Sequence, residues 1–176
     1  MVIEINYHNI THDDQNNGDG LRVVLWVSGC SHHCFECQNP QTWDENGGIS
    51  FDINAKEEIF EQLSMDYISG ITFSGGDPLY KNNLECISKL IDEIKEKFPD
   101  KTIWIYTGYT WEDIFYDNSE ESLTRKHIIT NINVLVDGEY MSELRDITLK
   151  WKGSSNQRVI NVQDSLKRGE VVLWTT

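Results

Sequence analysis

Basic residues are scarce in this sequence of 176 residues. Fifteen lysines and arginines stand against 29 aspartates and glutamates, which gives a formal net charge of −14. A surface of that sign repels the phosphate backbone of DNA or RNA, because binding there depends on lysine and arginine side chains that displace counterions. The composition therefore argues against direct binding of nucleic acid.

Long hydrophobic runs are also missing. Hydrophobic residues make up 39% of the chain, yet none of its runs approaches the roughly 20 apolar residues that cross a bilayer. The first six residues, MVIEIN, have neither the basic start nor the apolar stretch of a secretory signal. We therefore expect no membrane association and a cytosolic location. A chain of this length favours a single domain over residues 1–176.

Cysteines are few, and disulfides are not their expected use in a reducing compartment. Three of the four lie in segment 30–37, CSHHCFEC, with the spacing C-x3-C-x2-C. Thiolates select zinc or iron–sulfur centres, and a [4Fe-4S] cluster held by only three cysteines leaves one iron open to another ligand. We predict that Cys30, Cys34 and Cys37 hold such a cluster and make it catalytic. Cys86, alone in a predicted helix, is expected to be a packing residue.

A zinc site is the alternative use of the same loop. His32 or His33 would complete a Cys3His set, which is a standard set of zinc ligands. A fourth ligand from within so short a loop would be crowded, and structural zinc sites normally present two separated pairs of ligands. A protein that contained one zinc and no iron would instead be a non-catalytic module that binds a protein partner.

Strands and helices alternate along the chain. Short runs rich in β-branched and apolar residues predict strands at 22–27, 71–73, 103–106 and 132–136. Asn54 and Asn82 each precede a glutamate by three residues, which predicts two capped helices, and 111–126 is expected to be partly helical. This alternation indicates right-handed parallel crossovers. The predicted fold class is α/β, a partial (β/α) barrel with a curved, mostly parallel sheet and its chemistry at the carboxyl ends of the strands.

Seven further blocks accompany the cysteine loop in a fixed order. They are NGDGLR (17–22), VSGC (27–30), CQNPQTW (37–43), FSGGDPL (73–79), IYTGY (105–109), NVLVDG (133–138) and WKGSSNQR (151–158). With these blocks the sequence resembles the radical S-adenosylmethionine superfamily, and within it the activating component of anaerobic ribonucleoside-triphosphate reductase. The tail, 161–176, has no motif that we can interpret.

The resemblance implies a reaction. S-adenosylmethionine would bind the open iron through its amine and carboxylate, and one electron, by analogy from a flavodoxin, would cleave it to methionine and a 5′-deoxyadenosyl radical. That radical would remove the α-hydrogen of a glycine in the large subunit of the reductase, so the substrate would be a protein. The alternative within the superfamily is a small-molecule enzyme such as 7-carboxy-7-deazaguanine synthase.

The resemblance also implies contacts with the methionine end of the cofactor. Gly75 and Gly76 would let backbone carbonyls approach its amine closely, and Asp77 would add a direct or ordering hydrogen bond. An ordinary turn after a strand is the alternative for this block. Arg158 would pair with the cofactor carboxylate or with the glycine loop of the partner, or would simply lie at the surface.

The other implied contacts lie around the nucleoside. Glu36, Cys37 and Gln38 would line the adenine through backbone groups, although Glu36 stands where the superfamily usually has an aromatic residue. Thr107 and Asp137 follow predicted strands, where they would contact the ribose or the cofactor carboxylate, or help to hold a cation. A structural role in a turn is the alternative for both.

Overall fold

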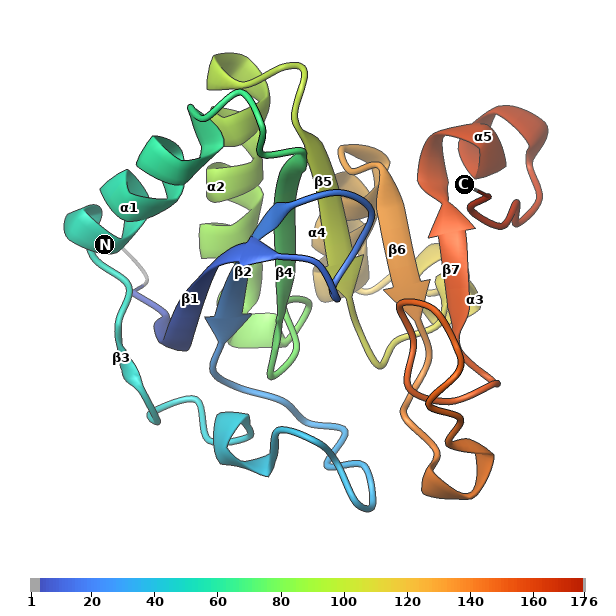
Figure 1. Ribbon diagram of the computed structural model, residues 1–176. Helices are drawn as coiled ribbons and strands as arrows, with labels where there is room; N and C mark the ends of the chain where they lie inside the picture. Colours follow the sequence, from blue (N-terminus) through green and yellow to red (C-terminus); the bar gives the residue numbers. More distant parts are fainter. Residues whose placement is uncertain (1–3, 176) are drawn as a thin grey trace.

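The frame of the molecule is a seven-stranded sheet, seen in a computed structural model that describes residues 4–175 (Figure 1). The strand order is β3-β1-β2-β4-β5-β6-β7. In chain order the strands are β1 (Asn6–Asp14), β2 (Arg22–Val27), β3 (Ile49–Ser50), β4 (Gly70–Gly75), β5 (Thr102–Tyr106), β6 (Val134–Asp137) and β7 (Arg158–Asn161). Strands β2, β4, β5 and β6 are parallel, whereas β1 and β3 on one side and β7 on the other are antiparallel. The predicted α/β class is confirmed, and the predicted parallel pairing holds for the four central strands.

The sheet is mixed rather than mostly parallel, and within residues 4–175 it is open, with β3 and β7 at its two edges. The sequence prediction placed the four parallel strands but named none of the three antiparallel ones. Strand β1 was missed because only part of its sequence, NYHNITHDD, is apolar and buried. Parallel strands are covered on both faces and read as continuous apolar runs, whereas strands near an edge do not.

Within residues 4–175, five α-helices accompany the sheet. They are α1 (Ile53–Leu63), α2 (Leu84–Lys97), α3 (Trp111–Tyr116), α4 (Glu120–Thr130) and α5 (Val162–Arg168). The stretch 111–126, expected to be partly helical, forms α3 and most of α4. Within residues 4–175 the structure contains no helix that is long and apolar enough to cross a bilayer.

The two predicted capping boxes are wrong in detail. Asp52, not Asn54, caps α1, because its backbone is extended and its carboxylate accepts a hydrogen bond of 3.0 Å from the Ala55 amide. Asn82 lies in a short 3-10 turn, Lys81–Asn83, that leads into α2. Its side chain is bonded to Glu45 instead of to the helix end.

The two faces of the sheet differ in character. Val23, Leu25 and Val27 of β2 join the large core with residues of α1, α2 and α4, and α2 and α4 lie behind the central strands in Figure 1. The alternate residues of β2, including Arg22 and Trp26, face the other way, because side chains alternate along a strand. That second face carries the candidate site.

The C-terminal tail is a packing element. It runs beside β7 through hydrogen bonds from the Asn161 amide to Val172 and from the Trp174 amide to Val159, each 2.8 Å. The Trp174 ring then meets the buried Trp104 edge-on at 5.8 Å between ring centroids. The tail therefore covers the edge of β7 and closes part of the second face.

Candidate functional site

The cysteine loop leaves the carboxyl end of β2. Its two ends are joined by hydrogen bonds from the Gly29 amide to Thr42 at 2.8 Å and from the Cys30 amide to Trp43 at 3.1 Å. Gly29 has a φ of 97°, a backbone conformation that favours glycine. The chain thus turns sharply after the strand and returns beside its own starting point, which holds the cysteines over the end of the sheet.

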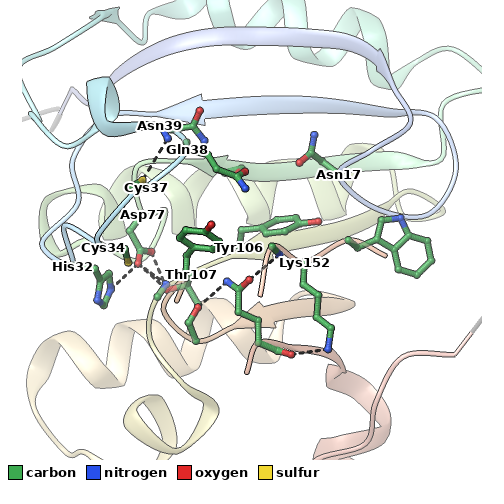
Figure 2. Close-up of a pocket in the computed structure, with 18 of the residues that line it drawn as sticks. Asn17, His32, Cys34, Cys37, Gln38, Asn39, Asp77, Tyr106, Thr107 and Lys152 are labelled. Carbon is green, nitrogen blue, oxygen red and sulfur yellow. Dashed lines mark hydrogen bonds and ion pairs between the residues drawn. The ribbon is translucent and has the colours of Figure 1, made fainter. Parts of the chain in front are cut away.

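One cavity of about 620 Å³ collects the three cysteines, Cys30, Cys34 and Cys37. Figure 2 shows this cavity, with Cys34 and Cys37 beside the ends of β4 and β5. The thiols are free and partly buried. Cys86 is also free, but it belongs to α2 and packs against the large core on the helical side of the sheet. The structure therefore brings the three spaced cysteines together and places the fourth elsewhere.

Burial controls the acidity of two of these thiols. Burial, together with the nearby negative charge of Asp77, raises the pKa of Cys30 to about 11. Burial also raises the pKa of Cys34. Both thiols are therefore protonated at neutral pH in the metal-free protein, and a metal centre that binds them displaces their protons.

Asp77 joins the ends of β4 and β5. The residue is 1% exposed, and its carboxylate oxygens accept hydrogen bonds from the Leu79 amide at 2.8 Å, the Gly108 amide at 3.0 Å and the Thr107 hydroxyl at 2.9 Å. Asp77 and Thr107 both line the cavity. Because the Thr107 hydroxyl donates to the Asp77 carboxylate, the main effect of this pair is to fix the part of the cavity wall formed by the ends of β4 and β5.

His32 links the cysteine loop to the segments that follow β4 and β6. Its Nε2 lies 2.9 Å from Asp77 Oδ2, and its Nδ1 lies 2.8 Å from Glu139 Oε1. Burial lowers the pKa of His32, but the two carboxylates outweigh burial and leave the pKa raised. The imidazole ring is thus held between two carboxylates, and these contacts keep the loop in place.

Both histidines of the loop are engaged in contacts with groups other than the thiols. His33 stacks on Trp43 with ring centroids 4.6 Å apart, while His32 binds its two carboxylates. Across residues 4–175, the structure contains no group of three histidine, cysteine, aspartate or glutamate side chains placed to hold a single metal ion.

Two glycines at the carboxyl end of β4 allow close contact with β2 and with the start of the cysteine loop. A Cβ atom on Gly76 would lie 2.5 Å from the Gly29 carbonyl oxygen, and one on Gly75 would lie 2.7 Å from the Val27 amide nitrogen. The amide of Asp77 donates to the Gly29 carbonyl at 2.7 Å. Glycine therefore lets the turn after β4 lie directly against the loop, while both residues still line the cavity.

The remaining sequence candidates divide into two groups. Gln38 lines the cysteine cavity, whereas Glu36 is exposed and has a left-handed φ of 56°.

Asp137 and Arg158 line a second, adjoining cavity. There Asp137 accepts hydrogen bonds from the Trp111 amide at 2.8 Å and from Arg158 Nε at 3.0 Å, and Arg158 also pairs with Glu112 at 2.6 Å. This ion pair gives Asp137 and Arg158 a structural role, and their contacts with a cofactor stay predictions.

Comparison with known proteins identifies relatives along most of the chain. A family model described as a 4Fe-4S single cluster domain matches residues 16–160. The anaerobic ribonucleoside-triphosphate reductase-activating protein of Enterobacteria phage T4 is 41% identical over 162 residues, which cover 92% of this chain and 97% of the relative. The proteins of that name from Escherichia coli strain K12 and Vibrio cholerae are 40% and 38% identical, over 88% and 87% of this chain and 97% and 96% of their own.

The chain belongs to the family of anaerobic ribonucleoside-triphosphate reductase-activating proteins. This membership confirms the resemblance carried by the sequence blocks and supports an iron–sulfur cofactor. The chemistry of the site agrees with it, because three thiols that share one cavity are the donor set such a cofactor needs.

The blocks that carried the family resemblance meet at the same cavity. Asn17, Ser74, Tyr106, Gly138 and Trp151, from five separate blocks, all line it. Sequence reasoning had not named them as site residues. Ser74 and Tyr106 each alternate with a core residue of a parallel strand, so the period of two along those strands was the signal that pointed to them.

Proposed function

We propose that this protein is a radical S-adenosylmethionine enzyme that generates a glycyl radical on the large subunit of anaerobic ribonucleoside-triphosphate reductase. The observation that carries the proposal is the meeting of Cys30, Cys34 and Cys37 with the family blocks at one cavity. Family membership supports the reductase as partner. The whole chain, 1–176, would act as one domain in the cytosol, with a flavodoxin as electron donor, and the open sheet would correspond to a partial barrel.

The cavity suits an iron–sulfur cluster with a small-molecule ligand. Its donors are three soft thiols, which select iron–sulfur centres over hard cations. Its volume, about 620 Å³, lies within the range of roughly 300–1,000 Å³ typical of pockets for molecules of cofactor size. Three protein ligands leave one iron open, and the chemistry that a cluster of this kind supplies is one-electron cleavage of S-adenosylmethionine to methionine and a hydrogen-abstracting 5′-deoxyadenosyl radical.

The residues of this chain then have distinct tasks. Cys30, Cys34 and Cys37 hold the cluster, while Gly75 and Gly76 present backbone groups to the methionine end of the cofactor. Both glycines line the cavity, and Gly76 also abuts Gly29 at the start of the cysteine loop, so they lie where the cluster and its ligand would meet.

Other residues orient these groups. Asp77 positions the turn after β4, because its oxygens accept hydrogen bonds from that turn and from the end of β5. Gln38 and the backbone of Cys37 line the side assigned to adenine, and Thr107 stands at the ribose side while it donates to Asp77.

The test is anaerobic reconstitution with iron and sulfide, followed by electron paramagnetic resonance of the reduced protein with and without S-adenosylmethionine. The proposal predicts a cubane signal that changes when the cofactor is added, because the cofactor binds an open iron. A protein that takes up one zinc and no iron, or a cluster whose signal ignores the cofactor, would refute it. Turnover of a pterin without any effect on the reductase would instead favour the small-molecule enzyme.

A further inference from the structure

A loop between β6 and β7 forms one wall of the cavity mouth. Its part from residue 144 to residue 152, here called the rim segment, projects from the same end of the sheet as the cysteine loop (Figure 1). Arg145, Asp146, Ile147, Leu149, Lys150, Trp151 and Lys152 all line the cysteine cavity. A partner that reaches the cavity on this side contacts the segment.

The rim segment is held in a defined shape. Arg145 pairs with Ser154 as an isolated β-bridge, and the Ser155 amide donates to the Leu144 carbonyl at 3.0 Å. Lys152 Nζ donates to the Gln157 carbonyl at 2.9 Å. These contacts fix both ends of the segment before any partner binds, which reduces the entropy lost on binding.

Apolar side chains at this end of the molecule are left uncovered. Ile147 is 85% exposed although it lines the cavity, and Met141 and Leu144, earlier in the same loop, are each 39% exposed. On the cysteine loop, Phe35 is 77% exposed. The two loops touch, because His32 Nδ1 of the cysteine loop lies 2.8 Å from Glu139 Oε1, just after β6. Exposed apolar side chains that gather around a cavity mouth are typical of a surface that binds another protein.

The rim segment differs in charge from the rest of the chain. It holds three cations, Arg145, Lys150 and Lys152, and one acid, Asp146, within a protein of net charge −14. Within the part of the chain that the structure describes, the ion pairs involve other residues, such as Arg158 with Glu112 and Lys56 with Glu93. Lys150 Nζ lies 4.1 Å from the centroid of the Trp151 ring rather than beside a carboxylate.

We propose that the rim segment is the docking site for the reductase, and that it receives an extended, partly apolar and acidic segment of the large subunit next to the target glycine. The inference rests on the proposed function. The net charge of −14 repels an acidic segment, whereas the three rim cations attract it, so charge favours the place where its glycine must react. Ile147 then serves as the apolar anchor.

Two variants test the docking site by direct binding of the purified large subunit to the cluster-loaded protein. Ile147→Asp removes the anchor and adds a negative charge, and we expect its Kd for the subunit to rise at least tenfold. Arg145→Glu combined with Lys150→Glu reverses the charge, and we expect a similar rise at low salt together with a weaker dependence of binding on salt concentration.

Matched control variants separate docking from general damage. Leu123→Asp places the same new charge on the exposed face of α4, and Lys167→Glu with Arg168→Glu reverses two cations in the last turn of α5. Both controls should bind the subunit within twofold of the wild type. Normal binding by the rim variants, or equal weakening in the controls, would overturn the inference.

The result that would refute the proposed function differs from the result that would refute the docking site. If the wild-type protein binds the large subunit but does not cleave S-adenosylmethionine under reduction, the proposed chemistry is wrong while the docking site can still be mapped. If the wild-type protein cleaves the cofactor and the rim variants bind the subunit normally, only the docking site is wrong.

Discussion

Two buried charges of opposite sign lie at opposite ends of the central strands. Arg22, at the amino end of β2, is 0% exposed, and Asp77, just beyond the carboxyl end of β4, is 1% exposed. Arg22 donates to Thr72 Oγ1 at 2.8 Å and to the carbonyl of Ile71 at 2.8 Å, whereas Asp77 accepts from backbone amides and from Thr107. Each charged side chain thus joins neighbouring strands: the guanidinium of Arg22 donates to oxygen atoms, and the carboxylate of Asp77 accepts from N–H and O–H groups.

The ends differ in what surrounds the charge. Arg22 also donates to the carbonyls of Asp19 and Thr102 and lies over the Trp104 ring at 5.4 Å, so its end of the sheet is filled. Burial lowers the pKa of Arg22 to about 10, and it stays charged at neutral pH. At the other end, Asp77 borders an open cavity with three thiols. We infer that the first charge serves stability, whereas the second positions a reactive site.

The largest effect is expected from a change of one cavity cysteine, which should remove the function of the site and leave the stability of the fold almost unchanged. Cys34→Ala should abolish iron uptake and cofactor cleavage, because two thiols do not retain the cluster. The free energy of unfolding of the metal-free protein should change by less than about 1 kcal/mol, since the side chain is only partly buried. Iron content, product analysis and urea unfolding measure the three quantities. Cys86→Ser is the control, and loss of iron from that variant would contradict the assignment.

The next largest effect is on stability, and it is expected from Arg22 at the other end of the central strands. Arg22→Met should lower the free energy of unfolding by about 3 kcal/mol, because several buried carbonyl and hydroxyl oxygens lose their donor. Iron bound per folded molecule should stay at the wild-type value. Urea unfolding and iron analysis check this. A variant of normal stability that fails to bind iron would show that the two ends are not independent.

A smaller effect is expected from Asp77→Asn. The amide keeps one acceptor oxygen but loses the charge that faces His32, so the free energy of unfolding should fall by about 1–2 kcal/mol. The change should be accompanied by weaker binding of S-adenosylmethionine, measured by titration of the cluster signal. Asp146→Asn, on an exposed carboxylate of the rim segment, is the control for loss of one negative charge. Unchanged cofactor binding in Asp77→Asn would remove the positioning role of Asp77.

The smallest effect concerns pH. The folded-state pKa of His32 is raised above the unfolded value, about 6.5, so the folded protein binds the proton more tightly. This stabilisation is fully present below pH 6.5 and is lost as the pH rises through the folded pKa. Unfolding of metal-free wild type and His32→Gln, compared at pH 5.5 and 8.5, should show a decline in the wild type that the variant lacks. If the free energy of unfolding of the two proteins changes with pH in the same way, the contacts of His32 with Asp77 and Glu139 do not contribute as described.

The same contrast explains what the sequence could predict. The parallel strands were predictable because burial on both faces leaves continuous apolar runs such as 22–27, and the cysteine loop because its spacing is specific. Strand β7 was not predictable, since RVIN has one fully buried residue and depends on pairing with β6. The cap of α1 was misplaced because Asp52 and Asn54 are both good capping residues, and only the backbone conformation distinguishes them.

For the site as well, the local sequence predicted which residues follow a strand, whereas the contacts between distant residues depended on the tertiary structure. Gly75, Gly76 and Asp77 were placed correctly at a strand end, but the reason for the glycines, contact with Val27 and Gly29, depends on a neighbouring strand. The sequence likewise did not show that Asp137 is held by Arg158, because 21 residues separate them along the chain. Pairings across the sheet are decided by tertiary packing rather than by local pattern.

The most direct test of the account mixes the reconstituted, reduced protein anaerobically with S-adenosylmethionine and the large subunit of the reductase, and records the electron paramagnetic resonance spectrum. The proposed function predicts an organic radical on the subunit, split into a doublet by the remaining α-hydrogen. The doublet should collapse to a singlet when the glycines of the subunit are deuterated. The proposed function also predicts 5′-deoxyadenosine and methionine as products. Cleavage of the cofactor with an intact cluster and no radical on the subunit would contradict it.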